Sequence, residues 1–134
     1  MRMIIMKLTK RLSVLYAEDN EDSGVMLKTL LEMSEIDVLI AISAQEALQA
    51  AQSGHFDLYL LDNLFPGECG LELCRQLRTF SPQTPIVFYS GAAYESDRQK
   101  GLEAGADVYL VKPEVNTVAS TIFQLVTRNP PNAN

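Results

Sequence analysis

The chain has 134 residues, of which 47% are hydrophobic and 21% are charged, and its formal net charge is −6. This length and composition are typical of one globular domain with its own core, and they exclude a disordered chain, a fibrous chain and a pair of ordinary domains. Because the charge is acidic and no basic cluster interrupts it, we expect no direct binding of DNA or RNA.

The chain begins with a short stretch that we interpret as an N-terminal extension, at residues 1–11. Its apolar run, residues 3–6, is too short for a signal peptide or a membrane span, so we expect a cytoplasmic protein without membrane contact. One domain is predicted at residues 12–128. Residues 129–134, which contain two prolines, are either a tail or the start of a linker.

Short apolar segments then alternate with longer segments of helical periodicity. Strands are predicted at residues 12–17, 38–41, 58–61, 86–89 and 108–111. The runs 58–61 and 86–89 are apolar throughout, as expected of central strands covered by helices on both faces. The predicted class is α/β: a doubly wound five-stranded parallel sheet of flavodoxin-like order 2-1-3-4-5, with five helices.

The segments between the strands contain signals for where helices begin, end and face the core. In the first helix the spacing predicts a buried stripe of Met26, Leu27, Leu30, Leu31 and Met33 and leaves Val25 exposed near the acidic end. Ser43 and Glu46 form a capping box that opens the second helix, and Gly54 and Gly105 end the second and fourth helices.

The last helix has an apolar face and an outer face without charge. Residues 116–127 contain no charged side chain, whereas a solvated helix usually contains several. We therefore expect this helix to meet another protein or form a homodimer. The residues predicted on its apolar face are Val115, Val118, Ala119, Ile122, Phe123 and Val126, and those predicted to point outward are Thr117, Ser120, Thr121 and Gln124.

Polar residues stand where four of the predicted strands end, which is where open α/β sheets bind ligands. Glu18 and Asp19 follow the first strand, Asp62 the third, Ser90 the fourth and Lys112 the fifth. Taken alone, the acidic pair could simply cap a helix. If the first and third strands are neighbours, however, three carboxylates meet, and a hard cation such as Mg²⁺ relieves their repulsion. With an ammonium and a hydroxyl beside them, they form a cradle for a phosphoryl group.

These motifs, in their order along residues 13–126, resemble response-regulator receiver domains of two-component signalling. The segments that carry the resemblance are Ala17–Asn20, Asp57–Gly67 with Gly70, Ile86–Ala92 and Gly105–Pro113. The resemblance implies a phosphoacceptor that takes a phosphoryl group onto Asp62 from a histidine kinase or a histidine phosphotransfer protein. It further implies that Asp62 is both metal ligand and nucleophile, that Asp19 binds Mg²⁺ with help from Glu18, and that the backbone carbonyl of Leu64 completes the protein ligands.

The resemblance also implies a conformational switch and a docking surface. Lys112 would stabilise charge on the phosphoryl group, and Ser90 would turn toward it, drawing its loop inward and leaving space into which Tyr109 rotates. Phosphodonor helices would dock beside Val25 and Pro113. In this interpretation the chain is a signalling domain that assists its own phosphorylation and dephosphorylation, not an enzyme with a separate substrate.

The sequence departs from the family pattern in two places. Glu18 replaces the usual Asp, and Gly91 stands where Ala is frequent, so the moving loop is freer and we expect faster loss of the phosphoryl group. Leu64 can lean over the phosphoryl group and has the opposite effect.

Three other functions fit parts of the sequence. A phosphatase with an aspartyl nucleophile would need a second Asp where Leu64 stands, and a flavin or nucleotide binder would need a phosphate loop where the acidic residues stand. The third, a pseudo-receiver that binds partners without being phosphorylated, remains an alternative.

Overall fold

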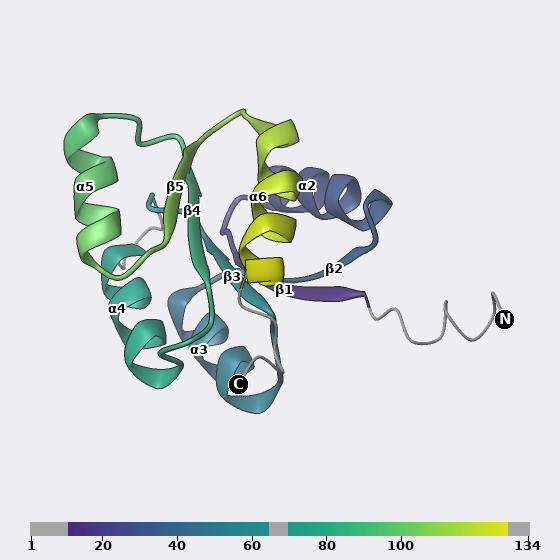
Figure 1. Cartoon of the computed structure of the whole chain (residues 1–134), viewed down its shortest axis with the longest axis horizontal. Helices are drawn as coiled ribbons and strands as arrows, with labels where there is room; N and C mark the ends of the chain where they lie inside the picture. The colour runs from purple at the N-terminus through teal and green to yellow at the C-terminus, as the bar shows by residue number, and fades with distance from the viewer. Residues whose placement is uncertain (1–10, 65–69, 129–134) are drawn as a thin grey trace, which may run out of the picture.

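A computed structural model describes residues 11–64 and 70–128 and has the predicted α/β architecture (Figure 1). All five strands are parallel, in the order β2-β1-β3-β4-β5. Most of the predicted extension and all of the predicted tail lie outside the described residues. No helix in the described ranges is long and apolar enough to cross a bilayer. The elements are β1 (Leu12–Ala17), α2 (Glu21–Met33), β2 (Ile36–Ala41), α3 (Ala44–Ser53), β3 (Leu58–Leu61), α4 (Gly70–Phe80), β4 (Ile86–Ser90), α5 (Glu95–Glu103), β5 (Val108–Val111) and α6 (Val115–Arg128).

Helices cover both faces of the sheet, as Figure 1 shows. Helices α2 and α6 pack on the face formed by alternate residues such as Val14 and Tyr16, and α3, α4 and α5 pack on the face that contains Leu15 and Ala17. Strands β3 and β4 are buried along their whole length, which confirms that they are central.

The helix signals in the sequence act largely as predicted. Asn20 caps α2 by accepting a hydrogen bond from the backbone N–H of Ser23, 2.8 Å away. Ser43 caps α3 in the same way through the N–H of Glu46, and Gly54 ends that helix. The Glu46 carboxylate, however, accepts from the N–H of Ile42, one residue before the position that a capping box predicts.

The predicted stripe of α2 is wrong at three positions. Leu27 and Leu31 are buried, but Met26, Leu30 and Met33 are 59%, 38% and 76% exposed. The helix rests on the sheet along Gly24, Leu27 and Leu31, spaced three and four residues apart. The other three lie outside this buried line, and Val25 is exposed as predicted.

Helix α6 is also rotated relative to the prediction. Thr121, which was expected outside, is buried, whereas Phe123, which was expected inside, is 40% exposed. The buried face is centred on Val118, Ile122 and Leu125, which pack against β4 and β1 residues of the same core. The uncharged outer surface of α6 therefore contains an aromatic ring as well as Ser120 and Gln124.

Candidate functional site

The carboxyl ends of β1 and β3 bring the acidic residues together. Ala17 is in register with Leu61, so Glu18 and Asp62 leave neighbouring strands side by side, and the backbone N–H of Asp62 donates to the carbonyl of Ala17 at 3.1 Å. Glu18, Asp19 and Asp62 each offer a carboxylate oxygen, and these oxygens lie within 4.8 Å of one another. The fold thus gathers the three carboxylates that the sequence analysis assigned to one site.

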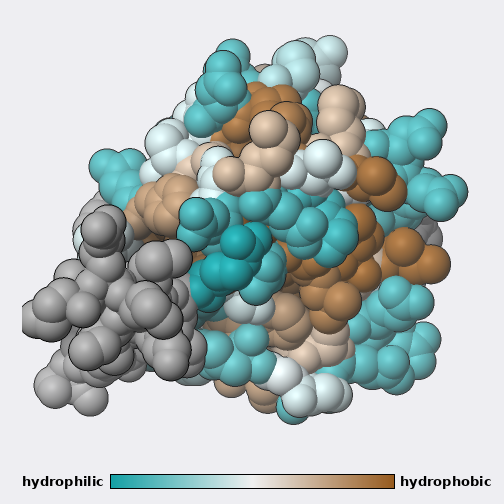
Figure 2. Space-filling view, turned by 90° about the vertical axis from the view of Figure 1, so that its right-hand side faces the viewer, coloured by the Kyte–Doolittle hydropathy of each residue, from teal (hydrophilic) through white to brown (hydrophobic). Residues whose placement is uncertain are grey.

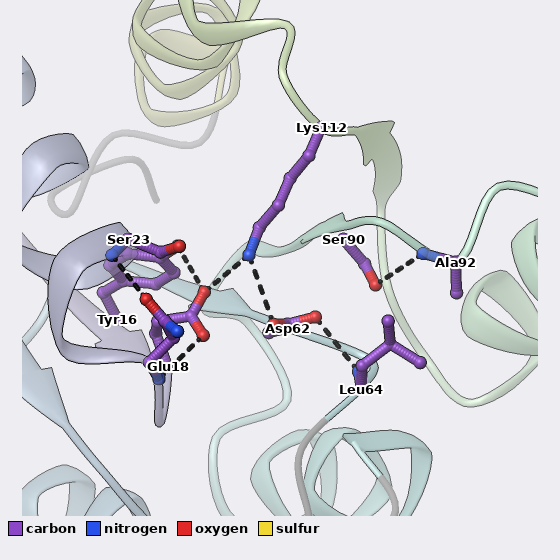
Figure 3. Close-up of polar contacts among 9 residues, drawn as sticks. Tyr16, Glu18, Ser23, Asp62, Leu64, Ser90, Ala92 and Lys112 are labelled. Carbon is purple, nitrogen blue, oxygen red and sulfur yellow. Dashed lines mark hydrogen bonds and ion pairs between the residues drawn. The ribbon is translucent and has the colours of Figure 1, made fainter.

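Lys112 reaches into this acid cluster from the end of β5 (Figure 3). Its Nζ lies 2.7 Å from Glu18 Oε1 and 3.3 Å from Asp62 Oδ2. The two carboxylates are 1% and 5% exposed, so an ammonium between them offsets a large cost of burying charge. Burial by itself lowers the pKa of Lys112, but hydrogen bonds and ion pairs with Glu18 and Asp62 raise it above its ordinary value.

Sequence reasoning missed Tyr16, a residue of β1 that stands two positions before Glu18. The Tyr16 hydroxyl donates to Glu18 Oε1 at 3.0 Å, and the backbone N–H of Asn20 donates to Glu18 Oε2 at 3.1 Å. Burial, followed by the negative charge of Glu18, raises the pKa of Tyr16. The sequence signal that could have identified this residue is a tyrosine within the predicted strand 12–17, because a buried hydroxyl requires a hydrogen-bond partner.

Asp62 is oriented by its own turn and by the start of α4. Its Oδ1 accepts from the backbone N–H of Leu64 at 3.0 Å, while Oδ2 faces Lys112. At Gly70 a Cβ would lie 2.6 Å from the Asp62 carbonyl oxygen and 2.9 Å from Asn63 Cα, so only glycine permits this approach of the helix to the turn. The Leu64 side chain is exposed on the same side and reaches toward Gly91.

Ser90 and Tyr109 meet at the backbone of Ala92. Ser90 Oγ accepts from the Ala92 N–H at 3.1 Å, and the Tyr109 hydroxyl donates to the Ala92 carbonyl at 2.7 Å. The Tyr109 ring is buried against Phe88, in a space that exists because α5 has a glycine there: a Cβ on Gly101 would lie 2.7 Å from Tyr109 Cδ2. The sequence analysis expected the Tyr109 ring to move inward only after the loop has moved. In this structure the ring is already buried.

A second residue that sequence reasoning missed is Asn63. Its side-chain amide donates to the Tyr109 hydroxyl at 3.2 Å. The residue next to Asp62 is thereby linked directly to the aromatic ring expected to switch. No local pattern indicates this contact, because the two residues are 46 positions apart.

One docking candidate, Val25, is on α2, and the other, Pro113, borders a pocket that α2 also lines. Pro113 lines an apolar pocket together with Met26, Leu27 and Leu30 of α2. Val25 is exposed on the same helix, although it does not line that pocket. Figure 2 faces the side of the molecule where α2 and β2 lie and shows apolar residues at the surface between hydrophilic ones.

The donor chemistry of the acid cluster fits a hard divalent cation. All three side chains offer oxygen, and Mg²⁺ is bound in proteins by one or two carboxylates together with water molecules. Asp19 is exposed, which leaves room for such waters. The residues present would therefore suit Mg²⁺.

Comparison with known proteins identifies the family. Residues 14–122 match the response regulator receiver domain. The alkaline phosphatase synthesis transcriptional regulatory protein PhoP of Bacillus subtilis is 36% identical over 115 residues, which are 83% of this chain and 48% of that protein. The response regulator ArlR of Staphylococcus saprophyticus is 34% identical over 118 residues, 87% of this chain and 53% of that protein. The chain spans about half the length of these relatives.

Solved structures agree with this result. The receiver domain of the Francisella response regulator 1452 superposes with a TM-score of 0.82 at 28% identity, covering 87% of this chain and 98% of that one. The response regulator TrrA of Thermotoga maritima, solved in complex with Mg²⁺-BeF, superposes with a TM-score of 0.77 at 28% identity, covering 85% and 98%. The motifs, the strand order and these matches agree, and the chain belongs to the response regulator receiver domains of two-component signalling.

Proposed function

We propose that this receiver domain accepts a phosphoryl group on Asp62 from the phosphohistidine of a histidine kinase or a histidine phosphotransfer protein, in a Mg²⁺-dependent reaction. The observation that carries the proposal is the position of Lys112 Nζ, which contacts both Glu18 and Asp62 at the acid cluster. A cation placed there offsets the charge of an incoming phosphoryl group as well as that of the carboxylates.

Asp62 is the nucleophile in this proposal. Leu64 N–H and Lys112 orient its two oxygens, one of which attacks phosphorus as the bond from phosphorus to the histidine nitrogen breaks, leaving an acyl phosphate on Asp62. Lys112 then stabilises the phosphoryl oxygens. Mg²⁺ bound by Glu18, Asp19, Asp62 and the carbonyl of Leu64 would supply the remaining positive charge. The protein that is similar to this chain and was solved with Mg²⁺-BeF supports this assignment.

The contacts of Ala92 suggest how phosphorylation would change the surface. If Ser90 turns its hydroxyl toward the phosphoryl group, the Ala92 N–H loses its acceptor. The carbonyl of the same residue accepts from Tyr109, so movement of this loop reaches that ring directly. Ser90 and Tyr109 are therefore the proposed switch residues, coupled through one peptide unit.

Phosphorylation itself is tested with acetyl phosphate and Mg²⁺, followed by intact-mass measurement of the full chain. We expect a gain of one phosphoryl group that disappears with EDTA and in Asp62→Asn. Asp37→Asn is a matched control, because Asp37 is an exposed acid paired with Arg11 on the edge strand β2. If the wild-type chain gains no phosphoryl group under these conditions, the pseudo-receiver alternative is correct.

We propose two partner surfaces. The phosphodonor would contact Val25 and Pro113, so Val25→Glu should slow transfer from a phosphorylated histidine protein while leaving labelling by acetyl phosphate unchanged. Transfer at the wild-type rate in this variant would remove Val25 from the surface.

The second surface is the uncharged outer face of α6, through which we propose a homodimer or a contact with a downstream target. Because Thr121 is buried, the test pairs the exposed positions Ser120 and Gln124. Ser120→Glu with Gln124→Glu should abolish any dimer that phosphorylation induces, measured by light scattering. An unchanged dimer would place the interface elsewhere. The domain limits at 12–128, the non-enzymatic role and the cytoplasmic location remain part of this proposal.

A further inference from the structure

The Tyr16 phenol is the part of the site that the proposed reaction does not use. Tyr16 lies on β1 with its side chain on the α2 and α6 face, and it is fully buried. Its hydroxyl donates to Glu18 Oε1 at 3.0 Å, the same oxygen that Lys112 Nζ contacts at 2.7 Å (Figure 3). Among the described residues Glu18 is the only hydrogen-bond partner of this hydroxyl.

The donors around Glu18 determine how many of its lone pairs a metal ion can use. An ionised carboxylate has about four acceptor positions, two on each oxygen. Tyr16 and Lys112 occupy both positions on Oε1. The backbone N–H of Asn20 occupies one position on Oε2, at 3.1 Å. Counting the donors of the described residues, one acceptor position therefore remains, and it is on Oε2.

We propose that Tyr16 is a positioning residue that limits Glu18 to a single oxygen toward a bound cation and thereby favours Mg²⁺ over Ca²⁺. The inference rests on the proposed function, because it assumes that the acid cluster binds Mg²⁺. Mg²⁺ requires octahedral geometry with few carboxylates and several waters, whereas Ca²⁺ takes more ligands and readily uses both oxygens of one carboxylate. A glutamate with one oxygen already saturated therefore suits the smaller ion.

Tyr16 matters here because the glutamate arm is long. Glu18 has one more methylene than an aspartate, and without a second fixed donor its carboxylate could turn both oxygens toward a metal ion. Lys112 alone cannot prevent this, since it also contacts Asp62 at 3.3 Å. Tyr16 is held by the packing of β1 and, within the described part of the chain, donates to Glu18 alone, so it fixes the orientation of Oε1.

The test compares Mg²⁺ and Ca²⁺ binding to the full chain by isothermal titration calorimetry. Tyr16→Phe keeps the ring and removes only the hydroxyl, so the fold is retained, which a melting curve checks. In Tyr16→Phe we expect the Ca²⁺ dissociation constant divided by the Mg²⁺ dissociation constant to fall about fivefold, which is the effect of one hydrogen bond. Tyr59→Phe is the matched control, because Tyr59 is buried on the opposite face of the neighbouring strand. It should leave the ratio unchanged.

A double variant separates positioning from a general effect on stability. If Tyr16 acts through Glu18, Tyr16→Phe should have no effect on the ratio once Glu18→Asp has shortened the arm. If the wild-type chain binds Mg²⁺ and Tyr16→Phe leaves the ratio unchanged, the inference is overturned while the proposed function stands. A wild-type chain that binds no Mg²⁺ overturns both.

Discussion

Asn63 is the residue whose position most changes the expected behaviour of the switch. In the structure Tyr109 is inside while Ser90 still bonds to its own loop, so the position of the ring does not depend on Ser90 having moved. The amide of Asn63 supplies a hydrogen bond that favours this inward position. Asn63 also immediately follows Asp62, and movement of the backbone there would strengthen or break that contact.

Asn63→Ala should therefore release the Tyr109 ring. The ring keeps its bond to the Ala92 carbonyl, so we expect a loss of about 1 kcal/mol in unfolding free energy together with ring exchange between two positions. The measurement is the aromatic NMR signal of Tyr109, assigned with Tyr109→Phe. A single sharp signal at its wild-type position in Asn63→Ala would mean that the amide does not restrain the ring.

Gly70 is the second residue with a distinct prediction. A Cβ there would overlap the Asp62 carbonyl oxygen, which belongs to backbone and cannot turn aside. We expect Gly70→Ala to cost about 2 kcal/mol and to slow labelling of Asp62 by acetyl phosphate, since the turn that orients Asp62 must shift. Gly54→Ala is the control, because its Cβ would meet neighbours only at 3.7 Å or more. Equal labelling rates in both variants would separate Gly70 from the geometry of Asp62.

At the scale of elements, the strands were easier to predict than the helix faces. The runs 58–61 and 108–111 are bounded by polar residues and match β3 and β5 at both ends. Strand β2 begins at Ile36, two residues before the prediction, because Glu35 makes a tight turn with φ 65° and the strand starts at once. Periodicity located α2 and α6 but did not determine which apolar stripe faces the sheet, since each helix has more apolar residues than it buries.

The end of α4 is tied to two strands by one side chain. Arg78 donates to the carbonyl oxygens of Gly105, Pro82 and Thr84, and it pairs with Asp107 at 3.0 Å. Asp107 in turn accepts from the N–H of Ile86, at the start of β4. These contacts lie at the amino ends of β4 and β5, whereas the acid cluster lies at the carboxyl ends of the strands.

Arg78→Leu should lower the unfolding free energy by about 2 kcal/mol, because three carbonyl groups and a carboxylate lose their donor. The variant should still be labelled at Asp62 at the wild-type rate, because the site is at the other end of the strands. Urea unfolding and acetyl phosphate labelling measure the two effects. Arg75→Leu is the control on the same helix, where the arginine forms an exposed pair with Glu72. A labelling rate that falls with stability would show that the two ends are coupled.

At the scale of the whole molecule, the site exists only when β1, β3, β4 and β5 are assembled. Lys112 and Glu18 are 94 positions apart, and their contact requires the strands between β1 and β5 to be assembled in order. Strand-end residues were predictable from sequence because all parallel strands end at one edge. The contacts of Tyr16 and Asn63 were not, because they depend on side-chain directions that only the packed sheet determines.

The unfolding free energy should accordingly depend on Mg²⁺. An ion that binds the folded chain and not the unfolded one adds about 2.7 kcal/mol at a hundredfold excess over its dissociation constant, so the melting temperature should rise with Mg²⁺ and return with EDTA.

Asp19→Asn gives the sharper form of this prediction. Asp19 is exposed and lies within 4.8 Å of two other carboxylates, so in the absence of metal its charge opposes folding. The variant should therefore melt slightly higher than the wild type in EDTA, yet lose most of the increase that Mg²⁺ produces. Glu21→Gln is the matched control, because Glu21 is an exposed acid at the start of α2 and lies outside the acid cluster. A Mg²⁺-dependent increase in Asp19→Asn as large as that in the wild type would mean that the ion binds elsewhere.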